Sequence, residues 1–333
     1  MRRLIFALIL LAAIIFIISN FGSFQNFAAV LQMGNPVWIG LAFIVQGTWL
    51  LNVSAQYRTA LRTVGIERNM RDLFVLMLGS NFLNVVAPSG GVSGMALFLD
   101  DARRRGISTA RVTIAGVIHV MFDYIAFCCV LALGLLVLIR RNTLSPIELV
   151  PSAIMFGTAI GLSAVVVLGM RSADALERLL VTAARAVNWA VRPVIRRGYL
   201  SEAAAQRFAL DTAEGFRTLR HQPRGGWIFP FALALSSKAL LITLLFLVFL
   251  VFDQPFSVGT LTAGFSIGFL FQIVSPTPMG IGVVEGAMTI VLRTLRVPLE
   301  AAVIITIVFR GFTLWLPLLY GAIALHFSGL RRK

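Results

Sequence analysis

Five ionisable residues lie inside otherwise apolar stretches of this sequence: His119, Asp123, Lys238, Glu285 and Arg310. A charge at the centre of a membrane helix costs about 2.5–3.5 kcal/mol on insertion scales, so each of these residues needs a compensating role. His119 and Asp123 are four residues apart and therefore share one face of a helix. Two interpretations fit the set. Either the residues form a headgroup-binding site, with His119, Asp123 and Lys238 as a proton relay or ion pair, or they are buried ion pairs that fix helix packing.

Two apolar runs are interrupted by proline and glycine in a common pattern, P-x5-G. The helix that begins after each break offers free backbone N–H groups and a partial positive charge, which suit an anion such as a lipid phosphate. The run before each break ends in free carbonyls, which suit an amine or another cation. The interrupting residues are Pro88, Gly90, Gly91 and Gly94 in the first run, and Pro276, Pro278, Gly280 and Gly282 in the second.

Glu285 and Arg310 are expected at similar depth. Glu285 follows Gly282 by one helical turn, and Arg310 lies about 11 residues, or roughly 16 Å, into the final apolar run. Side by side, the two charges would offset much of the cost of burying each other. A phosphate could compete for the arginine, because a guanidinium binds phosphate through two parallel hydrogen bonds.

The composition indicates a membrane protein. The chain of 333 residues is 58% hydrophobic and 13% charged, with a mean hydropathy of +0.89, whereas soluble domains are about 25% charged. Several runs exceed 18 apolar residues, which is typical of membrane-spanning helices, and their continuity excludes an alternating β-barrel. The net charge of +15 fits basic cytoplasmic loops and anionic lipid, so no nucleic acid partner is expected. The adjacent Cys128 and Cys129 cannot pair within a helix, and no metal or cofactor is expected.

Six full spans are predicted from hydropathy and from the positions of arginine. Basic residues at both ends of the chain place both termini in the cytoplasm. Residues 21–36 carry no charge, as expected of an outer loop, and 171–225 predicts a cytoplasmic connector of two amphipathic helices. All of these belong to one integral membrane domain over 1–330. The predicted spans are 4–20, 37–54, 111–139, 151–170, 228–252 and 299–326.

Two segments between these spans do not fit a full crossing. The run from 73 to 87 is about 15 residues, or roughly 22 Å of helix, which is short of the roughly 30 Å hydrocarbon core. The chain then returns to the basic residues 103–105, while 256–298 begins and ends on the outer side. We therefore predict two oppositely oriented re-entrant helical hairpins, which is the pattern of an inverted repeat in transporters. The alternative for the first segment is a pair of irregular full spans with an unusually basic outer loop.

Two stretches carry a resemblance to a known family: "SNFLNVVAPSGGVSGMALFLDDARRRGIS" and "SPTPMGIGVVEGAMTIVLRTLRVPLEAAVIITIVFRG". They resemble the signature regions of the flippase-like transmembrane domain of lysylphosphatidylglycerol synthases, in its stand-alone, UPF0104-type form. The resemblance covers essentially 1–330. It implies substrate-binding roles for Asn84, Pro88, Gly90, Gly91, Pro276, Pro278, Gly280, Gly282, Glu285 and Arg310.

The resemblance implies translocation of a phospholipid or related polar-headed lipid across the plasma (bacterial inner) membrane, with anionic or zwitterionic lipids as partners. Bifunctional relatives carry a soluble domain that transfers lysine to phosphatidylglycerol. This chain ends at Lys333, so lysyltransferase activity is not expected and the protein is interpreted as a transporter rather than an enzyme. The identity of the lipid, a homo-oligomer and a separate lipid-modifying enzyme as partner stay open.

The alternative function is a membrane-embedded transferase that acts on phosphatidylglycerol or polyprenyl-phosphate lipids. Its best support is the adjacent pair Asp100 and Asp101. A site for Mg²⁺ and pyrophosphate needs several spaced carboxylates, which this pair does not supply. A scaffold or channel subunit is a third class, although it would not need charged residues beside broken helices.

Overall fold

The computed structural model of the chain describes residues 21–86, 92–172 and 224–330, together with the isolated positions 175, 178, 182 and 216. These residues form helices joined by turns, and no strand occurs among them. Within this part of the chain, five helices are long and apolar enough to cross a membrane. The predicted fold class, an all-α polytopic membrane protein, is therefore confirmed.

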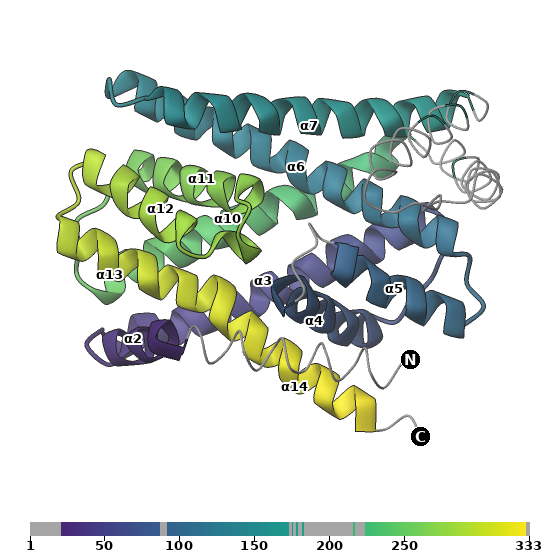
Figure 1. The fold of residues 1–333 in the computed structure, drawn as a ribbon, viewed down its shortest axis with the longest axis horizontal. Coiled ribbons are helices and arrows are strands. Elements are labelled where there is room, and N and C mark those ends of the chain that lie inside the picture. The colour runs from purple at the N-terminus through teal and green to yellow at the C-terminus, as the bar shows by residue number, and fades with distance from the viewer. Residues whose placement is uncertain are drawn as a thin grey trace, which may run out of the picture.

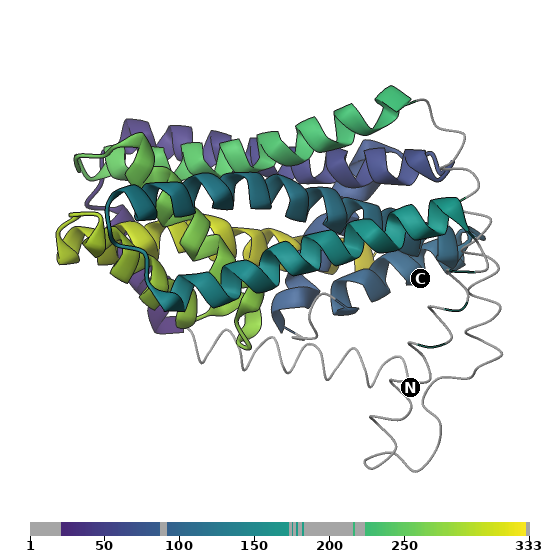
Figure 2. The same cartoon turned by 90° about the horizontal axis from the view of Figure 1, so that it is seen from above.

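The five long helices correspond to five of the predicted spans and run roughly along the long axis of the molecule (Figures 1 and 2). The first predicted span, 4–20, and nearly all of the connector 171–225 lie outside the described residues. The five helices are α3 (Pro36–Thr63), α6 (Thr109–Arg140), α7 (Pro146–Arg171), α10 (Ile228–Val251) and the last apolar segment, Leu299–Ala324.

Two of these helices are longer than predicted, for identifiable reasons. Helix α3 continues to Thr63 instead of ending near 54, because Tyr57 packs into a buried cluster with side chains of α6. Helix α7 begins at Pro146 rather than at 151, because Ser145 and Glu148 form a capping box that satisfies the first backbone N–H groups. Proline suits the first helical position, where its missing N–H costs nothing.

The segment 21–36, predicted as an outer loop, is helical for most of its length. Helix α2 (Phe21–Leu31) occupies this segment. Its Phe27 is 4% exposed and lies against Gly311 of the last span, where even a Cβ atom would overlap the ring. Packing of this helix against the last span gives a physical reason for its lack of charged residues.

The two broken apolar runs form two pairs of short helices. Their lengths of 12 to 17 residues correspond to roughly 18–26 Å, which is shorter than the hydrocarbon core. In Figure 1 the two pairs reach toward the middle of the molecule from opposite ends. The first pair is α4 (Met70–Val86) and α5 (Val92–Arg104), and the second is α11 (Val258–Val274) and α12 (Val283–Thr294), with the short turn η2 (Pro278–Gly280) between them.

A neutral amide joins the arms of the first pair. Asn84 Oδ1 accepts hydrogen bonds from the backbone N–H of Gly94 at 2.8 Å and from Ser93 Oγ at 3.2 Å. A Cβ on Gly94 would overlap Ser80 and Asn84, so glycine is needed for this close approach. Gly94 therefore fixes the distance between α4 and α5.

The tip of the second pair contains three unusual backbone positions within four residues. Gly280 and Gly282 have φ angles of 73° and 82°, in the left-handed region that favours glycine. Met279, with φ of 50°, shares this region although it carries a side chain. The tip also packs against the first pair, since Met279 contacts the cluster formed by Phe82 and Val85 of α4 with residues of the last span.

The last span is not one regular helix. It consists of α13 (Leu299–Arg310), the π-helical turn η3 (Gly311–Trp315) and α14 (Leu316–Leu330). π-helical turns are rare and occur frequently at functional sites. This turn follows Arg310 directly.

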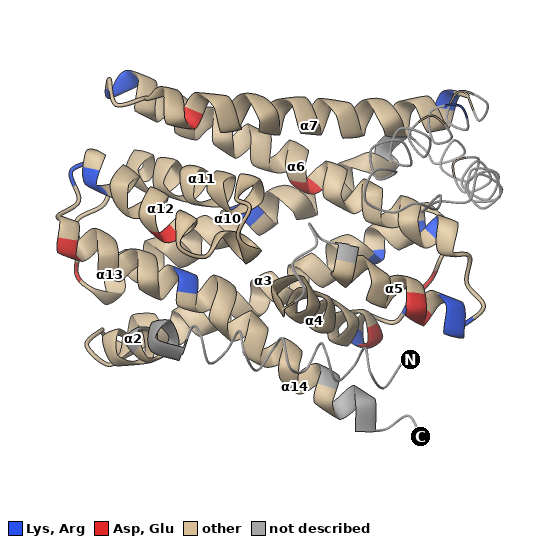
Figure 3. Cartoon of the chain, viewed as in Figure 1, with Lys and Arg blue, Asp and Glu red and all other residues tan. Residues whose placement is uncertain are grey.

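Charged side chains gather at the two ends of the molecule, with few between them (Figure 3). At one end, Asp101 forms ion pairs with Arg68 at 2.7 Å and with Arg105 at 3.1 Å. Burial alone would raise the pKa of Asp101, but the hydrogen bonds and charges of the two arginines outweigh burial and hold the pKa below its usual value. Asp100 pairs with Arg104 at 2.6 Å. Both carboxylates proposed for a metal site are thus engaged by arginine.

We expect Gly94→Val to destabilise the protein by about 1–3 kcal/mol, because the new side chain must separate α4 from α5. The measurement is thermal unfolding in detergent, with Gly157→Ala as the control, since a Cβ at Gly157 meets nothing within 4 Å. Equal melting temperatures for the two variants would show that the close approach at Gly94 is not needed.

Candidate functional site

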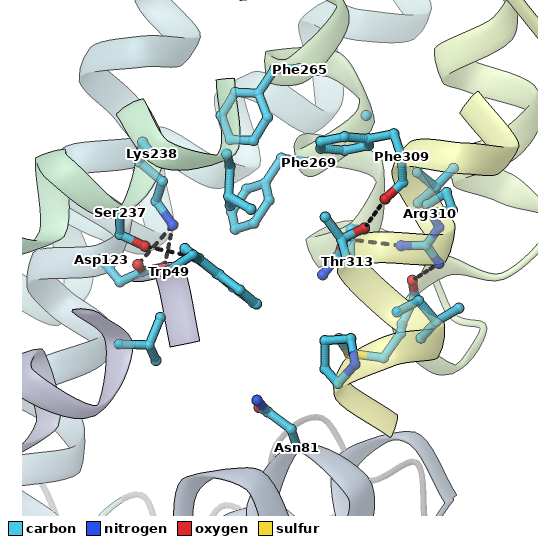
Figure 4. Close-up of a pocket in the computed structure, with 18 of the residues that line it drawn as sticks. Trp49, Asn81, Asp123, Ser237, Lys238, Phe265, Phe269, Phe309, Arg310 and Thr313 are labelled. Atoms are coloured by element: carbon cyan, nitrogen blue, oxygen red, sulfur yellow. Dashed lines mark hydrogen bonds and ion pairs between the residues drawn. The ribbon is translucent and has the colours of Figure 1, made fainter. Parts of the chain in front are cut away.

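A cavity of about 190 Å³ lies where the short helix pairs meet the long helices. Helices α3, α4, α6, α10 and α11, the η2 turn, α12 and the last span all contribute to its wall. Figure 4 shows its polar side chains on facing walls, with Lys238 on one side and Arg310 on the other. The polar residues of the lining are Asn81, His119, Asp123, Ser237, Lys238, Gln272, Arg310 and Thr313.

Lys238 and Asp123 form the first charged wall. The Lys238 Nζ lies 2.7 and 2.9 Å from the two carboxylate oxygens of Asp123. The lysine is 2% exposed and the aspartate 22% exposed, so the carboxylate is the partner that reaches the cavity. Lys238 Nζ also lies 4.2 Å from the centroid of the Phe269 ring, which offers a favourable cation–π contact. The two residues are 115 positions apart and belong to α6 and α10.

Beside this pair, Trp49 Nε1 donates a hydrogen bond to Ser237 Oγ at 3.0 Å. This bond ties α3 to α10 next to the ion pair. Sequence reasoning did not select either residue. A serine pair before Lys238, in "LSSKAL", was the available signal for a polar patch in an apolar run.

His119 lies near this wall but does not join the ion pair. Its ring meets that of Tyr57 edge-on, with centroids 5.5 Å apart. The described residues include no hydrogen-bond partner for His119 Nδ1 or for the Tyr57 hydroxyl, both of which are buried. The three-residue set proposed from the sequence is thus divided into an Asp123–Lys238 pair and a separate histidine.

Arg310 forms the second charged wall and is 2% exposed. Its Nε donates to Glu285 Oε1 at 2.8 Å, its first terminal nitrogen to Gln272 Oε1 at 3.2 Å, and its second to the Met279 carbonyl at 2.8 Å. These acceptors belong to α12, to α11 and to the tip between them. One guanidinium therefore holds the whole second helix pair against the last span.

Glu285 contacts Arg310 from outside the cavity lining. Its second oxygen accepts the backbone N–H of Gly282 at 2.7 Å, so the same carboxylate caps α12. Glu285 is 31% exposed, whereas its partner is almost fully buried. The sequence placed Glu285 and Arg310 at similar depth, and in the structure they are hydrogen-bonded. The acceptors Gln272 and Met279 O were not foreseen.

The remaining predicted site residues have other positions. Asn84 joins the arms of the first pair and does not line the cavity, and neither do Pro276, Pro278, Gly280 and Gly282, which shape the second tip. Pro88, Gly90 and Gly91 lie outside the described residues. Asn81, three residues before Asn84, lines the cavity although sequence reasoning did not select it. The dipeptide Ser80–Asn81 within an apolar run was the signal that could have found it.

Residues 4–321 match the family described as the lysylphosphatidylglycerol synthase TM region. The chain belongs to this family. As a member, it is similar to a UPF0104 membrane protein of Methanothermobacter thermautotrophicus, with 22% identity over 98% of this chain and 94% of the relative. A UPF0104 membrane protein of Methanocaldococcus jannaschii is 24% identical over 89% of this chain and 86% of the relative. This family of the synthase TM region was also the resemblance seen in the sequence.

The ion pair of this family member allows an asymmetric prediction. Asp123→Asn leaves the buried Lys238 without its carboxylate and should cost about 3–5 kcal/mol of stability. Lys238→Met should cost less, because the aspartate that remains is partly exposed to the cavity. The double variant should be more stable than Asp123→Asn alone. Thermal unfolding in detergent measures all three, and equal losses for the two single variants would contradict the interpretation of this wall.

Proposed function

We propose that this protein translocates a phospholipid, or a related polar-headed lipid, across the plasma membrane. The observation that carries the proposal is the pair of buried cations, Lys238 and Arg310, on the wall of one cavity between two broken helix pairs. Ionisable residues at membrane depth are costly, pair with one another or with backbone carbonyls, and mark substrate or ion pathways. A transporter places such a site near the midplane, between its repeats.

The proposed topology makes each short pair a re-entrant hairpin. The basic end, with Arg62 and Arg103, faces the cytoplasm, in accord with the positive-inside rule. The first hairpin then enters from the cytoplasm and the second from the outer side. Both termini are cytoplasmic, and 1–330 is one membrane domain with an inverted repeat.

The size of the cavity supports a headgroup as the bound part of the lipid. A volume of about 190 Å³ is comparable to the roughly 150 Å³ of an engineered cavity that binds benzene. It suits a phosphate ester rather than a whole lipid. The tails would therefore stay in the bilayer while the headgroup passes through the protein, with anionic or zwitterionic lipids as the partners.

In the proposed mechanism, the lipid phosphate takes the place of Glu285 on Arg310. The guanidinium offers two donors beyond the three that it uses, and a phosphate accepts from such a fork bidentately. Because Glu285 is partly exposed, its release toward a headgroup amine or a proton costs less than the release of a buried carboxylate. Release of Glu285 would then remove one of the three contacts by which Arg310 holds the second helix pair against the last span.

A transferase remains the competing class. Its candidate carboxylates, Asp100 and Asp101, are held by arginines, which disfavours a bound cation. A transport assay in liposomes with a labelled lipid separates the two classes, since transfer produces a chemically altered lipid and translocation does not. We propose no role for the protein in lysyl transfer, and a separate lipid-modifying enzyme and a homo-oligomer are compatible with the proposal.

We expect Arg310→Lys to lower the rate of lipid translocation about 10-fold or more, because lysine offers no planar fork and cannot reach three acceptors. Glu285→Gln should keep the fold, since its amide oxygen can still cap Gly282, but it should also slow translocation. The measurement is loss of fluorescence of a tail-labelled lipid when a membrane-impermeant quencher is added to proteoliposomes. Parent rates in both variants, at melting temperatures near the parent value, would remove Arg310 and Glu285 from the mechanism.

The topology can be tested by cysteine labelling after Cys128 and Cys129 are replaced by alanine. Cysteines at Arg62 and Arg103 should react only after the inner side is opened to a membrane-impermeant maleimide. Cysteines at Arg293 and Glu300 should react from outside. Labelling of the Arg103 position from outside would show that α4 and α5 are two crossings rather than a hairpin.

A further inference from the structure

Asn81 is a polar group in the cavity that the proposed mechanism does not use. It lies on α4, in the first helix pair, and its amide points into the open centre of the cavity (Figure 4). Its side chain makes no hydrogen bond to another part of the chain that the structure describes. An amide at membrane depth normally finds a partner, because an unsatisfied polar group in hydrocarbon costs several kcal/mol.

Most neighbouring polar groups of the lining are already engaged, although the buried His119 Nδ1 has no hydrogen-bond partner among the described residues. Lys238 is paired with Asp123, Arg310 has three acceptors, Ser237 accepts from Trp49, and Thr313 donates to the Phe309 carbonyl at 2.9 Å. Asn81 is thus the amide whose donors and acceptor stay available to a ligand. It also faces the wall of Arg310, whose carboxylate partner Glu285 lies outside the cavity lining, so an anionic group of the ligand suits that wall.

We propose that Asn81 determines headgroup specificity by binding a hydroxyl group next to the phosphate. An amide has two N–H donors and an acceptor oxygen, so it can both give to and accept from a hydroxyl. Asp123, which reaches the cavity at 22% exposure, adds carboxylate lone pairs that accept O–H bonds. The ligand class is a phosphate ester that bears free hydroxyl groups. This inference rests on the proposed function, since it assigns the class of lipid carried by that site.

The assignment follows from hydrogen-bond selectivity. A site with polar groups built for a hydroxyl discriminates strongly against an analogue that lacks it, because those groups are then left unpaired. A simple alkyl ester of the same phosphate would leave Asn81 without a partner. Lys238 and Arg310 would attract both ligands equally, so charge alone cannot distinguish them.

The experiment compares phosphatidylglycerol with phosphatidylethanol, two lipids with one negative charge that differ in the headgroup hydroxyls. Both carry the same fluorescent tail label and are tested in proteoliposomes with the parent protein, Asn81→Ala and the nearly isosteric Asn81→Leu. The control is Gln32→Ala, which removes an exposed amide at the end of α2, outside the cavity lining.

The parent protein should translocate phosphatidylglycerol about 3- to 10-fold faster than phosphatidylethanol, as expected for one or two neutral hydrogen bonds. Both Asn81 variants should lose this preference and move both lipids at the slower rate, while Gln32→Ala keeps it. A parent without preference, or an Asn81 variant that retains it, overturns the proposal. Failure of both Asn81 variants to fold would make the residue structural and would also overturn it.

A second arm separates a lipid headgroup from a free solute and keeps the test independent of transport. The detergent-solubilised protein is heated with sn-glycerol 3-phosphate or with propyl phosphate, and the melting temperature is recorded. A shift with the first compound alone, absent in Asn81→Leu, supports the hydroxyl site. If the parent moves neither lipid, the proposed function fails, and this shift then assigns the same chemistry to a soluble phosphate ester. No difference between the two compounds overturns the assignment of Asn81.

Discussion

The need to satisfy every polar group without water governs this structure. Two apolar runs are broken inside a protein whose long helices suit a membrane, and the backbone groups freed at each break must find partners within the protein. Arg310 supplies such partners at the second tip, because its fork reaches the Met279 carbonyl, Gln272 and Glu285 together. The charge is expensive to bury, and the broken backbone is unstable alone. The arginine satisfies polar groups at the break, and these groups in turn compensate its buried charge.

The two helix pairs solve the same problem with different chemistry. At the first pair, the neutral amide of Asn84 accepts the Gly94 N–H and brings two helices into close contact. At the second, a carboxylate caps Gly282 and is itself held by a buried arginine. An anion would not compete for the neutral contact between Asn84 and Gly94, whereas it would compete with Glu285 for Arg310. The two helix pairs are therefore similar in arrangement but differ in the charge of the contact that joins their arms.

Much of the fold followed from the sequence, because hydropathy, arginine positions and proline–glycine breaks are local signals. The long helices and both breaks were found in this way, as was the proximity of Glu285 to Arg310. Helix α2 was missed because its uncharged residues were interpreted only as a loop. The early start of α7 was missed because the N-cap at Ser145 was overlooked. The sequence could not single out neutral polar residues as members of the site, because burying a neutral side chain in an apolar run lacks the high cost of burying a charge. Such residues here are Asn81, Gln272 and Trp49. Their importance depends on which walls face one another, which is a property of the tertiary fold.

The π-helical turn after Arg310 has a consequence for how one helix serves two partners. A residue added to an α-helix rotates everything beyond it by about 100°. Before the turn, Arg310 faces the second helix pair. Leu314 and Trp315 within the turn, and Leu318 after it, pack with α4 of the first pair. The π-helical turn thus changes the direction in which side chains point between α13 and α14. One span is therefore in contact with both helix pairs, so a change in the position of either pair bears directly on it.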